Sequence, residues 1–186
     1  MRIRRLKRRK GRVLVVGLGQ VRQRDGGVGV HAVRELKKIP LEEVLMIEMG
    51  HMFLEPLDQI EWADHVLAID VMQAGGAPGT IYAYEVGGVE ERGFHSSRNE
   101  SVLISALRFL PKRVGPQIVV LGVEPRKIGC GFGLTPELER TIPRVLRGAR
   151  EIIAHMKESG RAEADWEELD CCPSIARIFS PEVRLL

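Results

Sequence analysis

Apolar residues along this chain fall into two patterns: short continuous runs, and longer stretches in which they recur every three or four positions. The continuous runs lie at residues 13–18, 44–48, 66–70 and 117–123. Runs of this length, rich in valine, isoleucine and leucine, are typical of strands that are buried on both faces of a parallel sheet. We therefore expect these four segments to form buried, mainly parallel strands.

The recurring pattern predicts helices over residues 29–38, 100–110 and 136–159. Pro143 lies inside the last of these and is expected to kink it or to delay its regular turns. A further segment, 80–86, alternates well enough for a strand near a sheet edge. Because parallel strands need crossover connections, the chain is predicted to be an α/β protein. Its architecture would be a three-layer α/β/α sandwich around a mostly parallel sheet of about five strands.

The first strand ends in a glycine-rich loop that runs from Gly17 to Gly29. Open α/β sheets bind ligands beyond the carboxyl ends of their strands, so this loop is a candidate site. It does not fit a nucleotide-binding loop, because the dinucleotide fingerprint needs a glycine where Arg22 stands and no Gly-Lys-Ser/Thr follows. We expect the loop to place an acid, Asp25, near the site instead.

Two further residues are expected at the same rim of the sheet. Asp70 ends the third apolar run, and His95 precedes a predicted helix. A carboxylate and an imidazole together suit nickel or zinc, or an acid–base pair. Ordinary roles stay open for each residue: a turn for Asp25, a turn cap for Asp70 and a loop position for His95. No Gly-x-Ser-x-Gly or His-Glu-x-x-His motif offers a competing catalytic set.

Charge divides the chain. Residues 1–12 carry eight Lys or Arg and no acid, whereas the rest of the chain carries 20 basic and 25 acidic side chains. The basic stretch is expected to be a solvated arm rather than a contact for nucleic acid or membrane. We divide the chain into this arm, a globular domain over residues 13–160, and a C-terminal extension over residues 161–186.

The composition is ordinary for a globular protein, with 44% hydrophobic and 28% charged residues. No apolar run approaches the ~20 residues of a membrane-spanning helix, and no signal peptide is predicted. The three cysteines, Cys130, Cys171 and Cys172, form neither a disulfide framework nor a Cys-x-x-Cys metal pair. We expect a cytoplasmic protein.

The order of these motifs resembles the nickel-iron hydrogenase maturation endopeptidases, over most of the predicted globular domain. The motifs that carry the resemblance are Gly17-x-Gly19, the loop from Asp25 to Gly29, Asp64 to Asp70 followed by Ala77-Pro78-Gly79-Thr80, His95 eight residues before Leu103, Leu121 to Pro125, and Gly133 to Pro136.

The resemblance implies that the protein removes a short C-terminal extension from a hydrogenase large-subunit precursor after nickel is inserted. The family is thought to use two acids and a histidine to read that nickel. By position, Asp70 is the second acid and His95 is the histidine; both would be catalytic residues and metal ligands, with Asp25 a further candidate ligand. Nickel would arrive with the substrate, and other divalent metals would be able to replace it. We expect a monomer that binds neither nucleic acid nor membrane.

The sequence departs from the family pattern at Gly26, where the first acid is expected. Glu48 and His51 are candidates to replace the missing ligand. The alternative is a non-catalytic relative that acts as a maturation chaperone or partner-binding protein. A small-molecule α/β hydrolase or nucleotide enzyme is a third possibility, supported only by the glycine loops. Whether the protein is a metal-dependent endopeptidase is therefore left open at this point.

Overall fold

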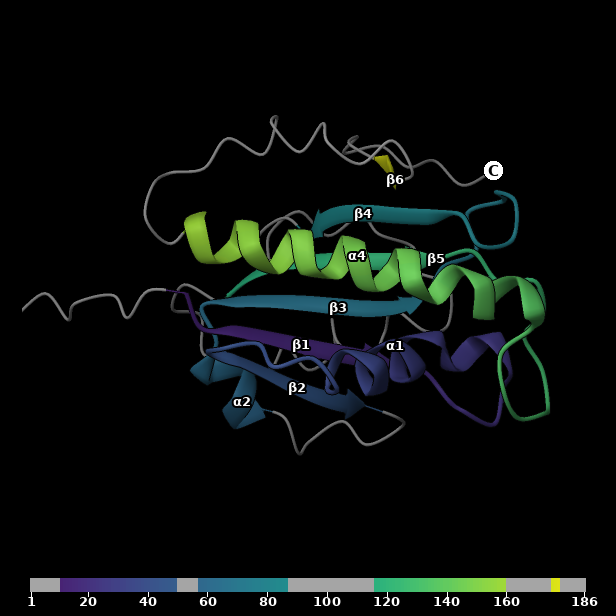
Figure 1. The fold of residues 1–186 in the computed structure, drawn as a ribbon, viewed down its shortest axis with the longest axis horizontal. Helices are drawn as coiled ribbons and strands as arrows, with labels where there is room; N and C mark the ends of the chain where they lie inside the picture. Colours follow the sequence, from purple (N-terminus) through teal and green to yellow (C-terminus); the bar gives the residue numbers. More distant parts are fainter. Residues whose placement is uncertain (1–10, 50–56, 87–115, 160–174, 178–186) are drawn as a thin grey trace, which may run out of the picture.

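A computed structural model describes residues 11–49, 57–86, 116–159 and 175–177 (Figure 1). The strands are β1 (Val13–Leu18), β2 (Val44–Met49), β3 (His65–Val71), β4 (Ile81–Val86), β5 (Gln117–Val123) and β6 (Ile175–Arg177). The helices are α1 (Val28–Leu36), α2 (Leu57–Trp62) and α4 (Pro136–Ser159), and a 3-10 turn, η1 (Asp25–Gly27), leads into α1.

The strands form one six-stranded sheet with the order β2-β1-β3-β5-β4-β6. The four strands predicted from the continuous apolar runs, β1, β2, β3 and β5, are all parallel. β4 pairs antiparallel with β5, and β6 pairs parallel with β4, which adds a strand to the five that were expected. The prediction of burial is wrong for β2, whose residues are largely half-buried or exposed, because β2 is the edge of the described sheet.

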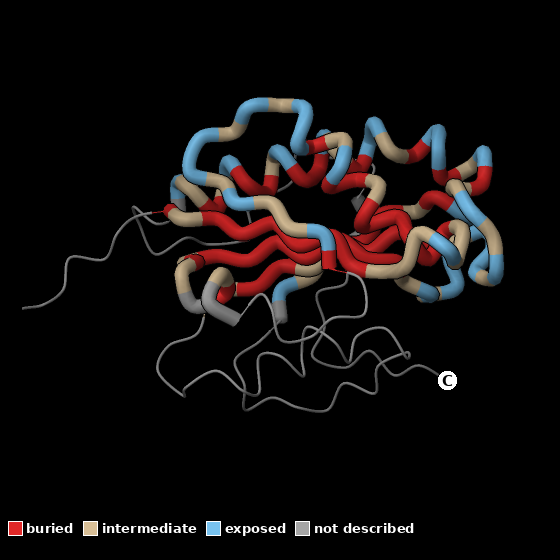
Figure 2. Tube along the Cα trace, turned by 90° about the horizontal axis from the view of Figure 1, so that it is seen from below, coloured by how far each residue is buried: buried red, intermediate tan, exposed pale blue. Residues whose placement is uncertain are grey.

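Helices lie on both faces of this sheet, as the three-layer prediction requires (Figures 1 and 2). α1 and α4 cover one face, and α2 packs on the other. α4 confirms the predicted helix over residues 136–159 and continues through Pro143. α1 ends at Leu36, slightly before the predicted end. The predicted helix over residues 100–110 lies outside the described residues. None of the helices in the described part of the chain is long and apolar enough to cross a membrane.

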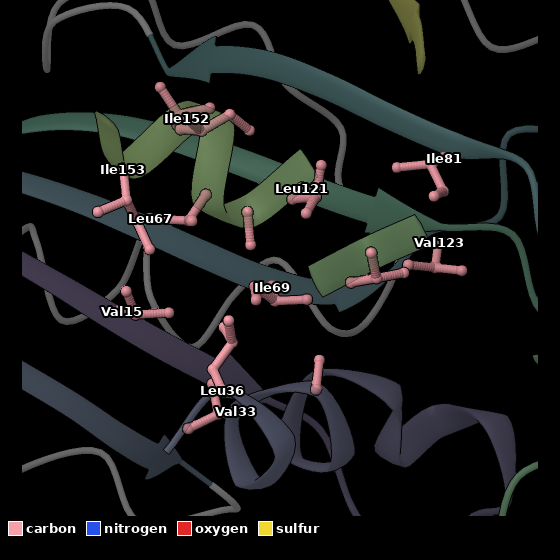
Figure 3. Packing of buried hydrophobic residues seen from close by; sticks show 14 of the residues in the cluster. Val15, Val33, Leu36, Leu67, Ile69, Ile81, Leu121, Val123, Ile152 and Ile153 are labelled. Carbon is pink, nitrogen blue, oxygen red and sulfur yellow. The ribbon is translucent and has the colours of Figure 1, made fainter. Parts of the chain in front are cut away.

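The larger hydrophobic core fills the space between the sheet and the pair α1 and α4 (Figure 3). Leu67 and Ile69 of β3 lie at its centre, and Leu36 of α1 and Ile153 of α4 reach them from the two helices. A smaller core lies on the opposite face beneath α2. Neighbouring residues of a strand point to opposite faces, so a strand covered on both faces needs a continuous apolar run. β1 and β3 are buried at every position for this reason.

Two glycines let the backbone of α1 lie directly on the sheet. A Cβ atom built on Gly17 of β1 would collide with the carbonyl of Gly29 and would lie 2.8 Å from Cγ2 of Val33. One built on Gly29 would collide with the carbonyl of Ile69 and lie 2.6 Å from the carbonyl oxygen of Leu18. Both glycines are needed because any side chain would push the helix away from β1 and β3.

The chain enters β1 through an ion pair. Arg12, which the predicted domain boundary assigns to the arm, donates from Nε to Oδ2 of Asp64 (3.2 Å) and from Nη2 to Oδ1 (3.2 Å). Its guanidinium carbon also lies 5.4 Å from the ring centroid of Trp62. Partial burial raises the pKa of Asp64, but the hydrogen bonds and charge of Arg12 outweigh it and hold the pKa below its usual value. Arg12 is thus fixed to the globular domain.

The close approach of α1 to the sheet predicts that a side chain at Gly29 destabilises the protein far more than one at Gly26. Gly29→Ala should lower the free energy of unfolding by about 1–3 kcal/mol, because the new methyl group overlaps two carbonyl oxygens. Gly26→Ala is the matched control, since the nearest atom to its Cβ is Cβ of Gln23 at 3.1 Å. Urea unfolding followed by circular dichroism measures both variants. Equal losses in the two would contradict the proposed contact.

Candidate active site

Asp25 is a fully buried carboxylate that joins three segments of the chain. Its Oδ2 accepts hydrogen bonds from the backbone N–H groups of Arg126 (2.9 Å) and Lys127 (2.8 Å) in the loop after β5. Its Oδ1 accepts from the backbone N–H of Thr135 (2.7 Å), and the Thr135 hydroxyl donates to Oδ2 (3.0 Å) just before α4. These four donors account for the burial of a charged group. They favour a structural role, so we leave Asp25 out of the ligand set proposed below.

Asp70 is the next-to-last residue of β3 and is only 7% exposed. Strand alternation places it on the same face as Ala68, which packs in the smaller core beneath α2. Its Oδ1 accepts a hydrogen bond from the backbone N–H of Val71 (2.7 Å). A Cβ atom built on Gly19 would lie 3.6 Å from the same oxygen and against the carbonyl of Gly26. Asp70 therefore borders the glycine loop, as expected from the ends of two adjacent parallel strands.

A third buried acid, Glu124, follows β5 at the same edge. Its Oε2 accepts hydrogen bonds from the backbone N–H of Ala74 and from the hydroxyl of Tyr82, both at 2.9 Å. Burial and the neighbouring Glu124 charge raise the pKa of Tyr82, so the phenol stays protonated as the donor. Glu124 thus fixes the loop that follows Asp70. Sequence analysis did not single it out, although an acid directly after an apolar strand is the signal that marked Asp70.

Gly26 stands where the resemblance expects the first acid. Its φ lies outside the left-handed region, so the backbone does not demand glycine there. The side chain of Gln23 lies beside it: a Cβ atom built on Gly26 would be 3.1 Å from Cβ of Gln23 and 3.4 Å from its Oε1. Apart from the chain neighbours of Gly26, the nearest side-chain polar group at this position is therefore the neutral amide of Gln23.

Of the two candidates to replace that acid, Glu48 and His51, the structure describes only Glu48. Glu48 accepts hydrogen bonds from Nε of Arg34 on α1 (2.9 Å) and from Nζ of Lys37 directly after α1 (3.0 Å). The hydrogen bond from Lys37, together with the hydrogen bond and charge of Arg34, lowers the pKa of Glu48 against the opposing effect of burial. Glu48 is thus paired with α1, as a half-exposed surface bridge. His51 lies outside the described residues, and so does His95.

A metal site is not complete within the described part of the chain, where no three His, Cys, Asp or Glu side chains are grouped to hold an ion. Catalytic zinc sites, for comparison, have three protein ligands and one open position. Of the predicted ligands, the structure places Asp70 at the carboxyl edge of the sheet and Asp25 in the interior. The pairing of Asp70 with His95 stays a prediction.

Comparison with known proteins assigns the family. The profile of the hydrogenase maturation protease family matches residues 30–152, which is more than half of the chain. The chain belongs to this family.

Two curated relatives show how far the similarity extends. The hydrogenase 2 maturation protease of Escherichia coli is 28% identical over 159 residues, which cover 80% of this chain and 93% of that protein. The coenzyme F420 hydrogenase subunit delta of Methanothermobacter thermautotrophicus is 26% identical over 147 residues, covering 73% of this chain and 90% of that protein. The similarity therefore spans most of each relative.

Solved structures of this family share the fold. The hydrogenase maturating endopeptidase of Escherichia coli superposes with a TM-score of 0.67 at 26% identity, covering 80% of this chain and 94% of that one. A nickel-iron hydrogenase maturation protease of Thermococcus kodakarensis gives a TM-score of 0.65 at 20% identity, covering 76% and 99%. The family match confirms the resemblance noted in the sequence, and the sheet confirms the predicted fold class.

In this member of the hydrogenase maturation protease family, the contacts of Asp25 predict a loss of stability and not merely of ligand binding. Asp25→Ala should lower the free energy of unfolding by about 3 kcal/mol, because buried backbone donors lose a charged acceptor. Asp25→Asn should also destabilise, since its NH2 group would face other donors. The exposed Glu139→Ala on α4 is the control, with a change within about 0.5 kcal/mol. Unchanged urea midpoints for both Asp25 variants would contradict the structural role.

Proposed function

We propose that this protein is an endopeptidase that removes a C-terminal extension from a nickel-loaded hydrogenase large subunit. The observation that carries the proposal is the placement of Asp70, buried at the carboxyl end of β3, in a chain of the hydrogenase maturation protease family. The hydrogenase 2 maturation protease of Escherichia coli, to which most of the chain aligns, is named for this kind of activity.

In this proposal Asp70 and His95 bind the nickel that the substrate brings. A carboxylate and an imidazole are ligands that suit a borderline divalent metal, and cadmium or zinc would bind the same pair. Nickel held in this way would position the precursor tail and polarise the scissile carbonyl or a water molecule. The protein's own part is to fix Asp70: Val71 donates to its carboxylate, and Glu124 holds the loop that follows.

Gly26 is the observation that favours the second candidate, a non-catalytic relative that binds the precursor as a chaperone. Asp25, the carboxylate next to Gly26 in the chain, is occupied by four hydrogen-bond donors, and the described residues group no three ligands that could hold a metal. The family assignment weighs against this alternative, because the profile is that of maturation proteases. The two candidates differ in one measurable result, which is whether the precursor is shortened.

Incubation with a nickel-loaded large-subunit precursor from the same organism distinguishes the endopeptidase from the chaperone. Mass spectrometry should show loss of the C-terminal peptide with the natural protein and no loss with Asp70→Ala. Binding to the precursor without any shortening, measured by gel filtration, would support the chaperone and overturn the protease.

The ligand assignment predicts that Asp70→Ala and His95→Ala each abolish detectable binding of Ni²⁺ or Cd²⁺ while the circular dichroism spectrum is kept. Titration calorimetry on the free protein measures this without any substrate. Glu139→Ala, an exposed acid on α4, is the matched control and should bind metal as the natural protein does. Retained affinity in both test variants would remove these residues from the ligand set.

Restoring the acid should strengthen the site. Because loss of even a supporting partner lowers metal affinity by about tenfold to a hundredfold, Gly26→Glu should raise Cd²⁺ affinity by at least that amount. The backbone at Gly26 permits a side chain, provided that Gln23 moves by a few tenths of an ångström. Gly26→Gln, equal in size but uncharged, separates the effect of charge from that of bulk. Equal affinities for the two variants would show that the charge at this position is not needed.

A further inference from the structure

Two loops at the carboxyl edge of the sheet are joined side by side by their backbones. We define the basic lobe as residues 20–27, which follow β1, and residues 125–134, which follow β5. The backbone N–H of Arg24 donates to the carbonyl of Gly131 (3.1 Å), and the N–H of Gly131 donates to the carbonyl of Arg22 (3.0 Å). Beneath these bridges, Asp25 binds the second loop with its carboxylate. The two loops therefore form one rigid projection.

The basic lobe carries a concentrated positive charge. It contains four cations, Arg22, Arg24, Arg126 and Lys127, and its one acid is the buried Asp25. Within the described part of the chain, no ion pair involves any of these four cations, whereas Arg12, Arg34, Lys37 and Lys38 all pair with acids. Uncompensated like charges on one projection repel each other, so this arrangement favours a negatively charged partner.

The same lobe exposes apolar side chains. Phe132 is 76% exposed and Ile128 is 36% exposed, and they are two of the three exposed large hydrophobic residues among those described. An exposed aromatic side chain next to arginines is the composition that protein–protein interfaces concentrate at their energetic centres. The lobe thus exposes both positive charge and apolar side chains.

The basic lobe also borders the candidate active site. The carbonyl of Gly26 lies against Gly19, and a Cβ atom built on Gly19 would lie 3.6 Å from Oδ1 of Asp70. The first loop of the lobe and Asp70 therefore lie at the same edge of the sheet. The guanidinium of Arg24 lies against the second loop, since a Cβ atom built on Gly131 would lie 2.8 Å from its Nε and 3.0 Å from its Cζ. Arg24 therefore helps to hold the two loops together.

We propose that the basic lobe is the docking surface for an acidic segment of the protein substrate that also carries an apolar side chain. The carboxylates of that segment would pair with Arg22, Arg126 and Lys127, and its apolar side chain would cover Phe132. That the partner is the protein substrate rests on the proposed function. That the bound segment is acidic and carries an apolar side chain is inferred from the lobe alone. A nucleic acid fits less well, because single strands bind along several stacked aromatic residues and the lobe has one.

Binding to a defined peptide tests the chemistry. A fluorescein-labelled peptide of Glu-Glu-Leu repeats should bind the natural protein, more weakly as salt rises, as followed by fluorescence anisotropy. Arg126→Glu with Lys127→Glu should weaken binding about tenfold, and Phe132→Ser should do the same. The control is Arg147→Glu with Arg150→Glu, an equal charge change on exposed residues of α4, which should leave the affinity within about twofold. Only variants whose thermal unfolding midpoint equals that of the natural protein are compared.

The outcomes separate the two proposals. Peptide affinity that is equal in the lobe and control variants overturns the docking surface. Tighter binding of an oligothymidine, lost in the same lobe variants, assigns the lobe to nucleic acid and also overturns it. With the precursor as substrate, the lobe variants should raise KM about tenfold at unchanged kcat. Failure of the natural protein to cleave the precursor overturns the proposed protease and leaves the peptide result standing on its own.

Discussion

Four hydrogen bonds to one buried carboxylate, that of Asp25, hold the functional edge of this protein together. The donors come from the loop after β5 and from the residue before α4, about a hundred positions away along the chain. A charge with no access to water is tolerated only where such donors surround it, so the three segments are fixed as a unit. The position of the glycine loop, the start of α4 and the basic lobe all depend on this one group.

The contact between α1 and the sheet has a complementary role. Gly17 and Gly29 allow helix and strand backbones to meet without intervening side chains, which brings η1 against the ends of β1 and β3. Asp70 is consequently held beside the glycine loop, on the face away from α1 and α4. Glu124 then fixes the loop that follows Asp70 through Ala74 and Tyr82. Three acids at one edge thus divide their roles: two hold loops, and Asp70 is the one proposed to bind the substrate's metal.

Gly26 gives this edge one negative charge fewer than the family pattern implies. In the proposed reaction a weaker metal site would place more weight on other contacts with the precursor. A rigid, positively charged lobe next to Asp70 is suited to supply them, because it can bind the protein part of the substrate independently of the metal. The protein would then recognise its substrate both by the nickel and by the protein surface of the precursor.

The sequence by itself determined five of the six strands, two of the helices and the placement of Asp70, because continuous apolar runs and helical periodicity follow from burial. It also identified the family through the order of its motifs. The edge position of β2 and the roles of Asp25, Glu48 and Glu124 were decided only by the tertiary structure. A carboxylate looks the same in sequence whether it faces a metal, an arginine or a backbone amide. What distinguishes these cases is the partner, and for Asp25 the partners lie on segments that meet only when the sheet has formed.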